Sequence, residues 1–203
     1  MRNHLQFNWW KYLAVIVLPV ILWCSVFSAI AEPNSDQQVN VLYVGESLDT
    51  QSLRQQLADA MPQLTQQQIK SVAVDTALLD GSSYNALLTA RCFDYDILIL
   101  EESSLQKNTG QTVFTRLTSK LLEQFPNTPH YTEEVEDGGT LAFGLVLYDG
   151  TAENTFSACY TGSQTCYLFI SPYSVNFDTL NENGTAGNDA ALKAAQYLLS
   201  HAN

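Results

Sequence analysis

Basic residues are scarce in this chain, and their scarcity excludes one large class of partners. The 203 residues include nine Lys and Arg against 21 Asp and Glu, and the formal net charge is −12. A surface of this sign repels nucleic-acid phosphates, and no basic patch in the sequence offsets it. We therefore expect no nucleic acid among the partners of this protein.

Histidine is also rare, which limits the chemistry open to the chain. The chain has three histidines, and neither His130 nor His201 belongs to a recognisable motif. The stretch nearest to the serine motif of a hydrolase, residues 45–49, lacks the second glycine. Zinc ligands in short spacings and a phosphate-binding loop are both missing, and the acidic run over residues 133–137 lacks the alternating spacing of a calcium loop. The sequence thus predicts no catalytic residue, no metal site and no cofactor.

One uncharged apolar segment covers residues 12–31. Its 20 residues have about the length that a helix needs to cross the hydrocarbon core of a bilayer. Arg2 and Lys11 precede it and every acidic residue follows it, so the positive-inside rule places the rest of the chain outside the cytoplasm. We favour a single-pass anchor in the cytoplasmic membrane. The alternative is a signal peptide cleaved after Ala31, which would make the protein secreted.

The remainder of the chain has the size of one domain. Residues 32–38 are polar and contain proline, which suits a short tether. Residues 39–203 are about as long as a typical single domain with one core. We therefore divide the chain into a membrane segment (1–31), a tether (32–38) and one extracytoplasmic domain (39–203).

Strand and helix patterns alternate in the first half of this domain. Short β-branched apolar runs predict three buried strands, over residues 39–45, 71–77 and 96–100. Apolar residues at helical spacing predict a helix after each strand, over residues 49–62, 84–92 and 113–125. Asp49 is a helix cap and Pro62 a helix end in this prediction. Such alternation predicts a parallel sheet with right-handed crossovers.

The second half has a different pattern. Residues 141–148 and 166–171 predict two strands with no helix between them, and a closing helix is predicted over 189–201. Strands connected in this way pair antiparallel. The predicted fold class is α/β, with a three-layer domain, a mixed and mostly parallel sheet, and an antiparallel C-terminal hairpin.

Two cysteines in this half suggest a covalent link. A hairpin loop over residues 161–164 would place Cys159 directly opposite Cys166. A disulfide there persists outside the cytoplasm and adds roughly 2 to 3 kcal/mol of stability in the chain-entropy model. The alternative is two separate buried thiols.

Polar residues follow two of the predicted parallel strands. Glu46 and Ser47 come after the first strand, and Glu101, Glu102 and Ser103 come after the third. Ligands of open parallel sheets gather beyond the carboxyl ends of the strands, so these five residues are candidate ligands for sugar hydroxyls or a cationic group. Ordinary loop and helix-cap roles are the alternative.

Several stretches resemble known proteins. Residues 95–103 (YDILILEES), and residues 166–170 (CYLFI) followed by 174–176 (SVN), resemble segments of extracellular solute-binding proteins of bacterial ABC transporters. In those proteins a lobe strand ends in a polar, ligand-facing loop. Residues 9–13 (WWKYL) and 39–46 (VNVLYVGE) are similar to segments of small single-span proteins of Gram-positive gut bacteria.

The resemblance implies a domain like one lobe of a solute-binding protein, acting without catalysis as an accessory or sensor beside an ABC-type uptake system. Its expected partners are the membrane, through residues 12–31, and ABC transporter subunits or a small polar solute. Two other classes remain open. One is an extracellular glycosidase-like hydrolase that uses Glu46 with Glu101 or Glu102, and the other is a structural protein of the cell envelope.

Overall fold

The computed structural model describes residues 9, 11, 13–24, 34–79, 81–135, 138–177 and 189–200. The chain divides into two compact units, Met1–Asn34 and Ser35–Asn203. Residues 13–24 of the first unit are helical. Within the described ranges, no helix combines the length and the hydropathy needed to cross a membrane. Part of the predicted anchor, Tyr12 and residues 25–31, lies outside the described residues, so the anchor stays a prediction.

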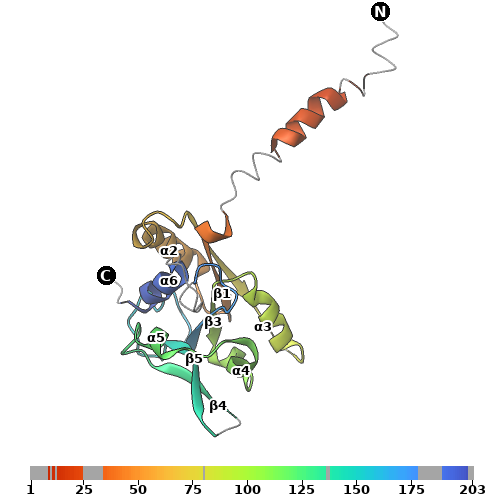
Figure 1. The fold of residues 1–203 in the computed structure, drawn as a ribbon. Coiled ribbons are helices and arrows are strands. Elements are labelled where there is room, and N and C mark those ends of the chain that lie inside the picture. Colours follow the sequence, from red (N-terminus) through yellow and green to blue (C-terminus); the bar gives the residue numbers. More distant parts are fainter. Residues whose placement is uncertain are drawn as a thin grey trace, which may run out of the picture. The chain divides into compact units, whose positions relative to one another are not determined.

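A six-stranded mixed sheet forms the centre of the second unit (Figure 1). Its strand order is β2-β1-β3-β6-β5-β4. The strands are β1 (Gln38–Val44), β2 (Ser71–Ala77), β3 (Ile97–Glu101), β4 (His130–Glu134), β5 (Thr140–Tyr148) and β6 (Cys166–Ile170). Strand β1 pairs parallel with β2 and β3, whereas β3 with β6, β6 with β5 and β5 with β4 pair antiparallel. The predicted α/β class and mixed sheet are confirmed, but the sheet is not mostly parallel.

The helices of this unit are α2 (Thr50–Leu64), α3 (Tyr84–Cys92), α4 (Thr109–Val113), α5 (Ser119–Leu122) and α6 (Ala190–Leu199), with 3-10 turns η1 (Ser35–Gln37) and η2 (Glu102–Ser104). Asp49 caps α2 as predicted, because its carboxylate accepts from the Ser52 amide at 3.0 Å. Pro62 lies inside α2 rather than ending it, and the helix continues to Leu64.

The single helix predicted over residues 113–125 is wrong. Two short helices, α4 and α5, occupy this region instead, with an extended segment between them. Phe114 leaves the helix to stack on Phe169 of β6, with ring centroids 4.3 Å apart. The Leu117 amide then donates to the Ala142 carbonyl of β5 at 2.8 Å. Pairing with the sheet therefore outweighs the helical spacing of the apolar residues.

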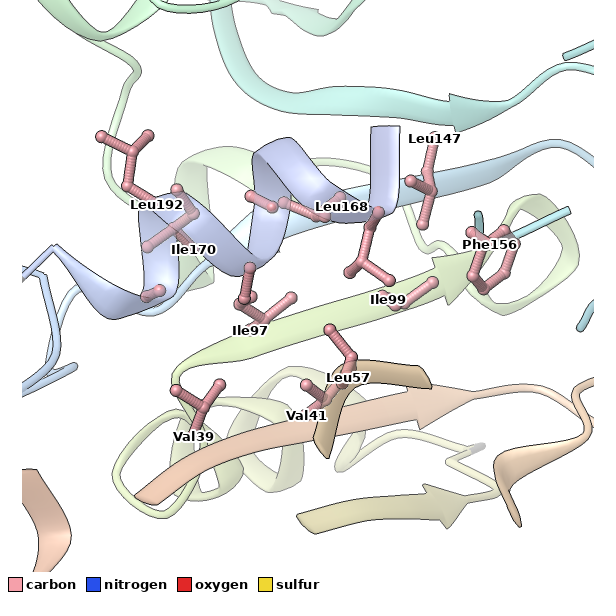
Figure 2. Close-up of a cluster of buried hydrophobic side chains, with 14 of the residues drawn as sticks. Val39, Val41, Leu57, Ile97, Ile99, Leu147, Phe156, Leu168, Ile170 and Leu192 are labelled. Carbon is pink, nitrogen blue, oxygen red and sulfur yellow. The ribbon is translucent and has the colours of Figure 1, made fainter. Parts of the chain in front are cut away.

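Two hydrophobic clusters lie on opposite faces of the sheet and give the domain three layers. Successive residues of β1 alternate between them, since Val41 and Tyr43 belong to one cluster and Leu42 and Val44 to the other. Helices α2, α5 and α6 supply the first cluster, and α3 and α4 supply the second. Figure 2 shows α6 lying over β3 and β6, with Leu168, Ile170 and Leu192 among the packed side chains.

This topology defines two ends of the sheet that matter for function. The chain leaves β1 toward α2 on one face of the sheet and leaves β3 toward α4 on the other face, so the boundary between these two parallel neighbours is a topological switch point. The carboxyl ends of β1 and β3 lie at one end of the sheet, which we call the carboxyl end. At the other, amino end, β1 and β3 begin and the antiparallel β6 finishes, with Ile170 opposite Ile97.

Candidate functional site

At the carboxyl end, the structure brings together only some of the five predicted ligand residues. Val44 pairs with Leu100, so the polar residues that follow β1 and β3 start side by side. Glu46, Glu102 and Ser103 are exposed. Ser47 is half-buried, whereas Glu101 is buried, with 4% of its surface exposed. The five residues therefore do not face one common open space.

Glu101 is enclosed by two tyrosines. The hydroxyl of Tyr43 donates to its Oε1, and the hydroxyl of Tyr160 donates to the same oxygen at 3.2 Å. The Ser47 amide donates to the Tyr43 hydroxyl at 3.2 Å. Burial, followed by the hydrogen bond to Glu101, raises the pKa of Tyr43. Burial is also the main cause that raises the pKa of Tyr160, so both hydroxyls keep their protons and act as donors.

The chain itself covers this end of the sheet. Leu48 forms an antiparallel bridge with Tyr160, and the Thr161 amide donates to the Ser47 carbonyl at 2.9 Å. On the β3 side, the Glu102 amide donates to the Thr165 carbonyl at 2.9 Å. Residues 159–165 thus pair with the segments that follow β1 and β3, in the region where ligands of parallel sheets bind. The geometry favours structural roles here, and ligand binding by Glu46, Ser47, Glu101, Glu102 and Ser103 stays a prediction.

The same geometry bears on the glycosidase alternative. Glycoside hydrolysis needs two carboxyl groups that face the bond to be cleaved from either side. The Glu101 carboxylate is buried against Tyr43 and Tyr160, while Glu46 and Glu102 are exposed. A pair that uses Glu101 would include a buried carboxylate that two tyrosines already engage, so this end of the domain does not favour the hydrolase.

The predicted disulfide is not formed, because the hairpin that would create it is absent. Cys159 and Cys166 are free thiols in the structure. The Cys159 carbonyl accepts from the Asp49 amide at 2.9 Å, so this segment pairs with residues 47–49. Cys166 instead lies opposite Glu101 and Tyr148 in β6. Backbone pairing with the loop after β1 therefore replaces the expected hairpin.

At the amino end, a buried carboxylate organises a second polar cluster. Asp96 is 4% exposed. Its Oδ2 accepts from the Asn40 amide at 2.9 Å, and its Oδ1 accepts from Ser174 Oγ at 2.5 Å and Asn176 Nδ2 at 3.1 Å. Burial raises the pKa of Asp96 despite these donors, which lower it. The cluster fixes the loop after β6 to the beginnings of β1 and β3.

A cavity of about 220 Å³ opens beside Asp96. Its lining residues are Ser35, Asn40, Phe93, Asp94, Tyr95, Asp96, Tyr173, Ser174 and Val175. The rings of Phe93 and Tyr173 stack with centroids 4.1 Å apart, although 63% and 49% of these side chains remain exposed. Exposed aromatic surface next to a buried carboxylate is typical of a recognition site. We call this space the amino-end cavity.

Sequence reasoning missed the amino-end cavity. It placed Asp96 at the start of a predicted strand, it named Ser174 and Asn176 only within a resembling segment, and it did not single out Phe93 or Tyr173. Each of these two aromatic residues lies in a polar stretch next to a predicted element, and that placement was the available signal. Their stacking depends on the antiparallel pairing of β6 with β3, which the sequence does not specify residue by residue.

A metal site is not evident in the described residues, where no three His, Cys, Asp or Glu side chains are grouped to hold an ion. Comparison of the chain with protein-family models, curated protein sequences and solved structures finds no match. The proposed function therefore rests on the fold and on the amino-end cavity.

Proposed function

We propose that the second unit is a non-enzymatic recognition domain that binds a small polar solute in the amino-end cavity. The observation that carries this proposal is the combination of the buried Asp96 carboxylate with the exposed Phe93 and Tyr173 stack around one cavity. Small-molecule sites typically join an apolar or aromatic wall to a few fixed polar groups. The cavity has the size for a ligand of metabolite class.

The polar wall is rigid before a ligand arrives. Ser174 and Asn176 hold the Asp96 carboxylate in place, and the Ser171 amide donates to the Asp96 carbonyl at 2.9 Å. Preorganised groups lose little conformational entropy on binding, which favours affinity. The lining contains carboxylates, amide and hydroxyl groups but no histidine, cysteine or lysine. This composition supports recognition more than covalent or acid–base catalysis.

The position of the cavity supports a sensor or accessory role. Ser35, the first residue of this unit, lines the cavity, and its carbonyl accepts from Asn176 Nδ2 at 3.1 Å. Asn176 also donates to Asp96. One side chain therefore contacts both the proposed solute site and Ser35, at the start of the unit. With residues 12–31 as a membrane anchor, the domain would deliver or report a solute beside an ABC-type uptake system.

Isothermal titration calorimetry on the full chain in a neutral detergent tests this proposal. The probes are glucose, glycine, putrescine and tetramethylammonium chloride. We expect binding by at least one probe, weakened by Tyr173→Ala and unchanged by Glu102→Gln at the carboxyl end. Tyr173 is half-exposed and Glu102 exposed, so neither substitution disturbs the core. No heat with any probe, or weakening by Glu102→Gln but not by Tyr173→Ala, would contradict the proposal.

A further inference from the structure

The amino-end cavity offers many hydrogen-bond acceptors and few donors. The Asn40 side-chain amide donates to the Asp94 carbonyl at 3.1 Å, and its oxygen accepts from Gln38 at 2.6 Å. The Ser174 hydroxyl donates to Asp96. The side-chain donors of Asn40 and Ser174 are therefore already engaged by the protein.

The Tyr95 hydroxyl and the Asp94 carboxylate are two further polar groups of the lining. The Tyr95 hydroxyl donates to Asp75 Oδ2 at 3.0 Å and so is directed to another partner. The carboxylate of Asp94 is exposed, and no hydrogen bond or ion pair links it to another residue in the described ranges. An ionised carboxylate only accepts hydrogen bonds, so the Asp94 carboxylate needs a donor from the ligand.

The charge of the lining has one sign. Asp94 and Asp96 are its ionisable acids, and no Lys, Arg or His is among the lining residues. The whole chain carries a formal net charge of −12, which raises the local concentration of small cations near the surface. An anionic ligand would meet repulsion, and a neutral sugar would find the Ser35 and Tyr173 hydroxyls as its main side-chain donors.

Aromatic surface completes the arrangement. The Phe93 and Tyr173 rings are stacked within 18° of parallel, and both remain largely exposed. The face of an aromatic ring attracts a cation, and such contacts contribute about 0.5 to 2 kcal/mol. Organic ammonium groups carry a positive charge, present N–H donors or methyl groups, and bind to the faces of aromatic rings.

We propose that the amino-end cavity binds the ammonium group of a small organic amine. This inference rests on the proposed recognition function and adds the chemical class of the ligand. Asp94 supplies the accessible negative charge, Asp96 adds a buried carboxyl group held by hydrogen bonds, and Phe93 with Tyr173 forms the aromatic wall. The carboxylates exclude anions, and the engaged donors disfavour neutral polyols.

Calorimetric titration of the full chain with putrescine, tetramethylammonium chloride, 1,4-butanediol and glucose, at low ionic strength, tests the class of ligand. Butanediol has the carbon chain of putrescine without its charge. We expect one of the two cations to bind and both neutral compounds to fail, with the affinity falling as NaCl is added. Asp94→Asn and Phe93→Ala should each weaken binding about three- to tenfold. Glu123→Gln is the matched control for loss of an exposed carboxylate outside the cavity and should change nothing.

The outcomes separate this inference from the proposed function. Binding of glucose or butanediol that is lost in Phe93→Ala but kept in Asp94→Asn would overturn the cationic ligand and leave solute recognition standing. Amine binding that Glu123→Gln weakens as much as Asp94→Asn would reveal non-specific attraction and overturn the inference. No binding by any of the four probes would overturn the inference, and the proposed function would fall with it if glycine did not bind either.

Discussion

The hydroxyl of Tyr160 donates a hydrogen bond of 3.2 Å to Oε1 of Glu101, 59 residues earlier in the chain. Tyr43 donates to the same oxygen, so one buried carboxylate connects β1, β3 and the segment that covers the carboxyl end. No Lys or Arg is hydrogen-bonded to it within the described residues. A buried carboxylate in this position depends on its neutral donors.

Removing either donor should therefore destabilise the domain. We expect Tyr160→Phe and Tyr43→Phe each to lower the free energy of unfolding by about 1 to 3 kcal/mol, because a buried acceptor loses a partner. Tyr43→Phe should cost more, since the Ser47 amide also donates to that hydroxyl. Urea unfolding followed by circular dichroism measures both.

Tyr173→Phe is the matched control for this prediction. It removes a half-exposed hydroxyl and should change the unfolding free energy by less than about 0.5 kcal/mol. In a double-mutant cycle with Glu101→Gln, the effects of Tyr160→Phe should not add. Additive effects would show that the two side chains are not coupled.

Gly45 lets Glu101 occupy its position. A Cβ at this glycine would lie 2.6 Å from Glu101 Cδ and 2.7 Å from the Tyr43 hydroxyl. Gly45→Ala should displace the carboxylate and destabilise the domain by about 1 to 3 kcal/mol, the usual cost of overpacking. Gly139→Ala is the control, because its nearest neighbour, Val135 Cγ2, is 3.7 Å away. Equal melting temperatures for the two variants would contradict the close packing.

Local patterns were sufficient to predict much of the first half of the domain. Strand β2 has the predicted bounds, Ser71–Ala77, and Asp49 caps α2 as its sequence position indicated. In this region β1 and β3 are short, mostly apolar and buried, and β2 is a short β-branched edge strand. Helices α2 and α3 each bury one apolar stripe, so short-range periodicity is sufficient to predict these elements.

The second half depends on long-range pairing, which periodicity does not encode. Strand β4 was not predicted, because residues 130–134 alternate between exposed and half-buried polar or aromatic side chains at the sheet edge. Within it, Glu133 accepts from the Gly110 and Gln111 amides at 2.7 and 3.0 Å, a contact between residues more than 20 positions apart. The amino-end cavity arises in the same way, from the pairing of β6 with β3.

Three buried thiols offer a chemical test of the corrected cysteine assignment. Burial raises the pKa of Cys92 and of Cys166 to about 12, and it also raises the pKa of Cys159. At pH 8 the thiolate fraction of the first two is on the order of 10⁻⁴, so alkylation should be very slow. We expect iodoacetamide to leave all three unlabelled in the native protein.

A buried thiol and a disulfide would both resist labelling in the native protein. Alkylation after unfolding in urea, without a reducing agent, distinguishes the two. Free thiols should then be alkylated at Cys92, Cys159 and Cys166, as peptide mass spectrometry would show. If Cys159 and Cys166 stay unlabelled until a reductant is added, the two residues are bonded to each other and the free-thiol assignment is wrong.

Asp96 and Ser174 give a prediction with a defined pH dependence. The folded-state pKa of Asp96 is raised by burial, so the folded protein binds this proton more tightly than the unfolded chain does. The contribution of Asp96 to stability therefore falls as pH rises from the unfolded value, about 3.9, through the folded value. Ser174 limits the fall, because its hydrogen bond lowers the pKa.

Ser174→Ala removes that donor and should raise the Asp96 pKa further. The variant should be less stable than the wild type by about 1 to 3 kcal/mol at pH 7. Because a protonated Asp96 needs the donor less, the difference should shrink as pH falls through the folded-state pKa values. Urea unfolding from pH 4 to pH 8 measures it, with Ser103→Ala as the exposed control. A wild-type-to-variant difference that is constant over this range would mean that Ser174 stabilises the loop after β6 without acting on the charge of Asp96.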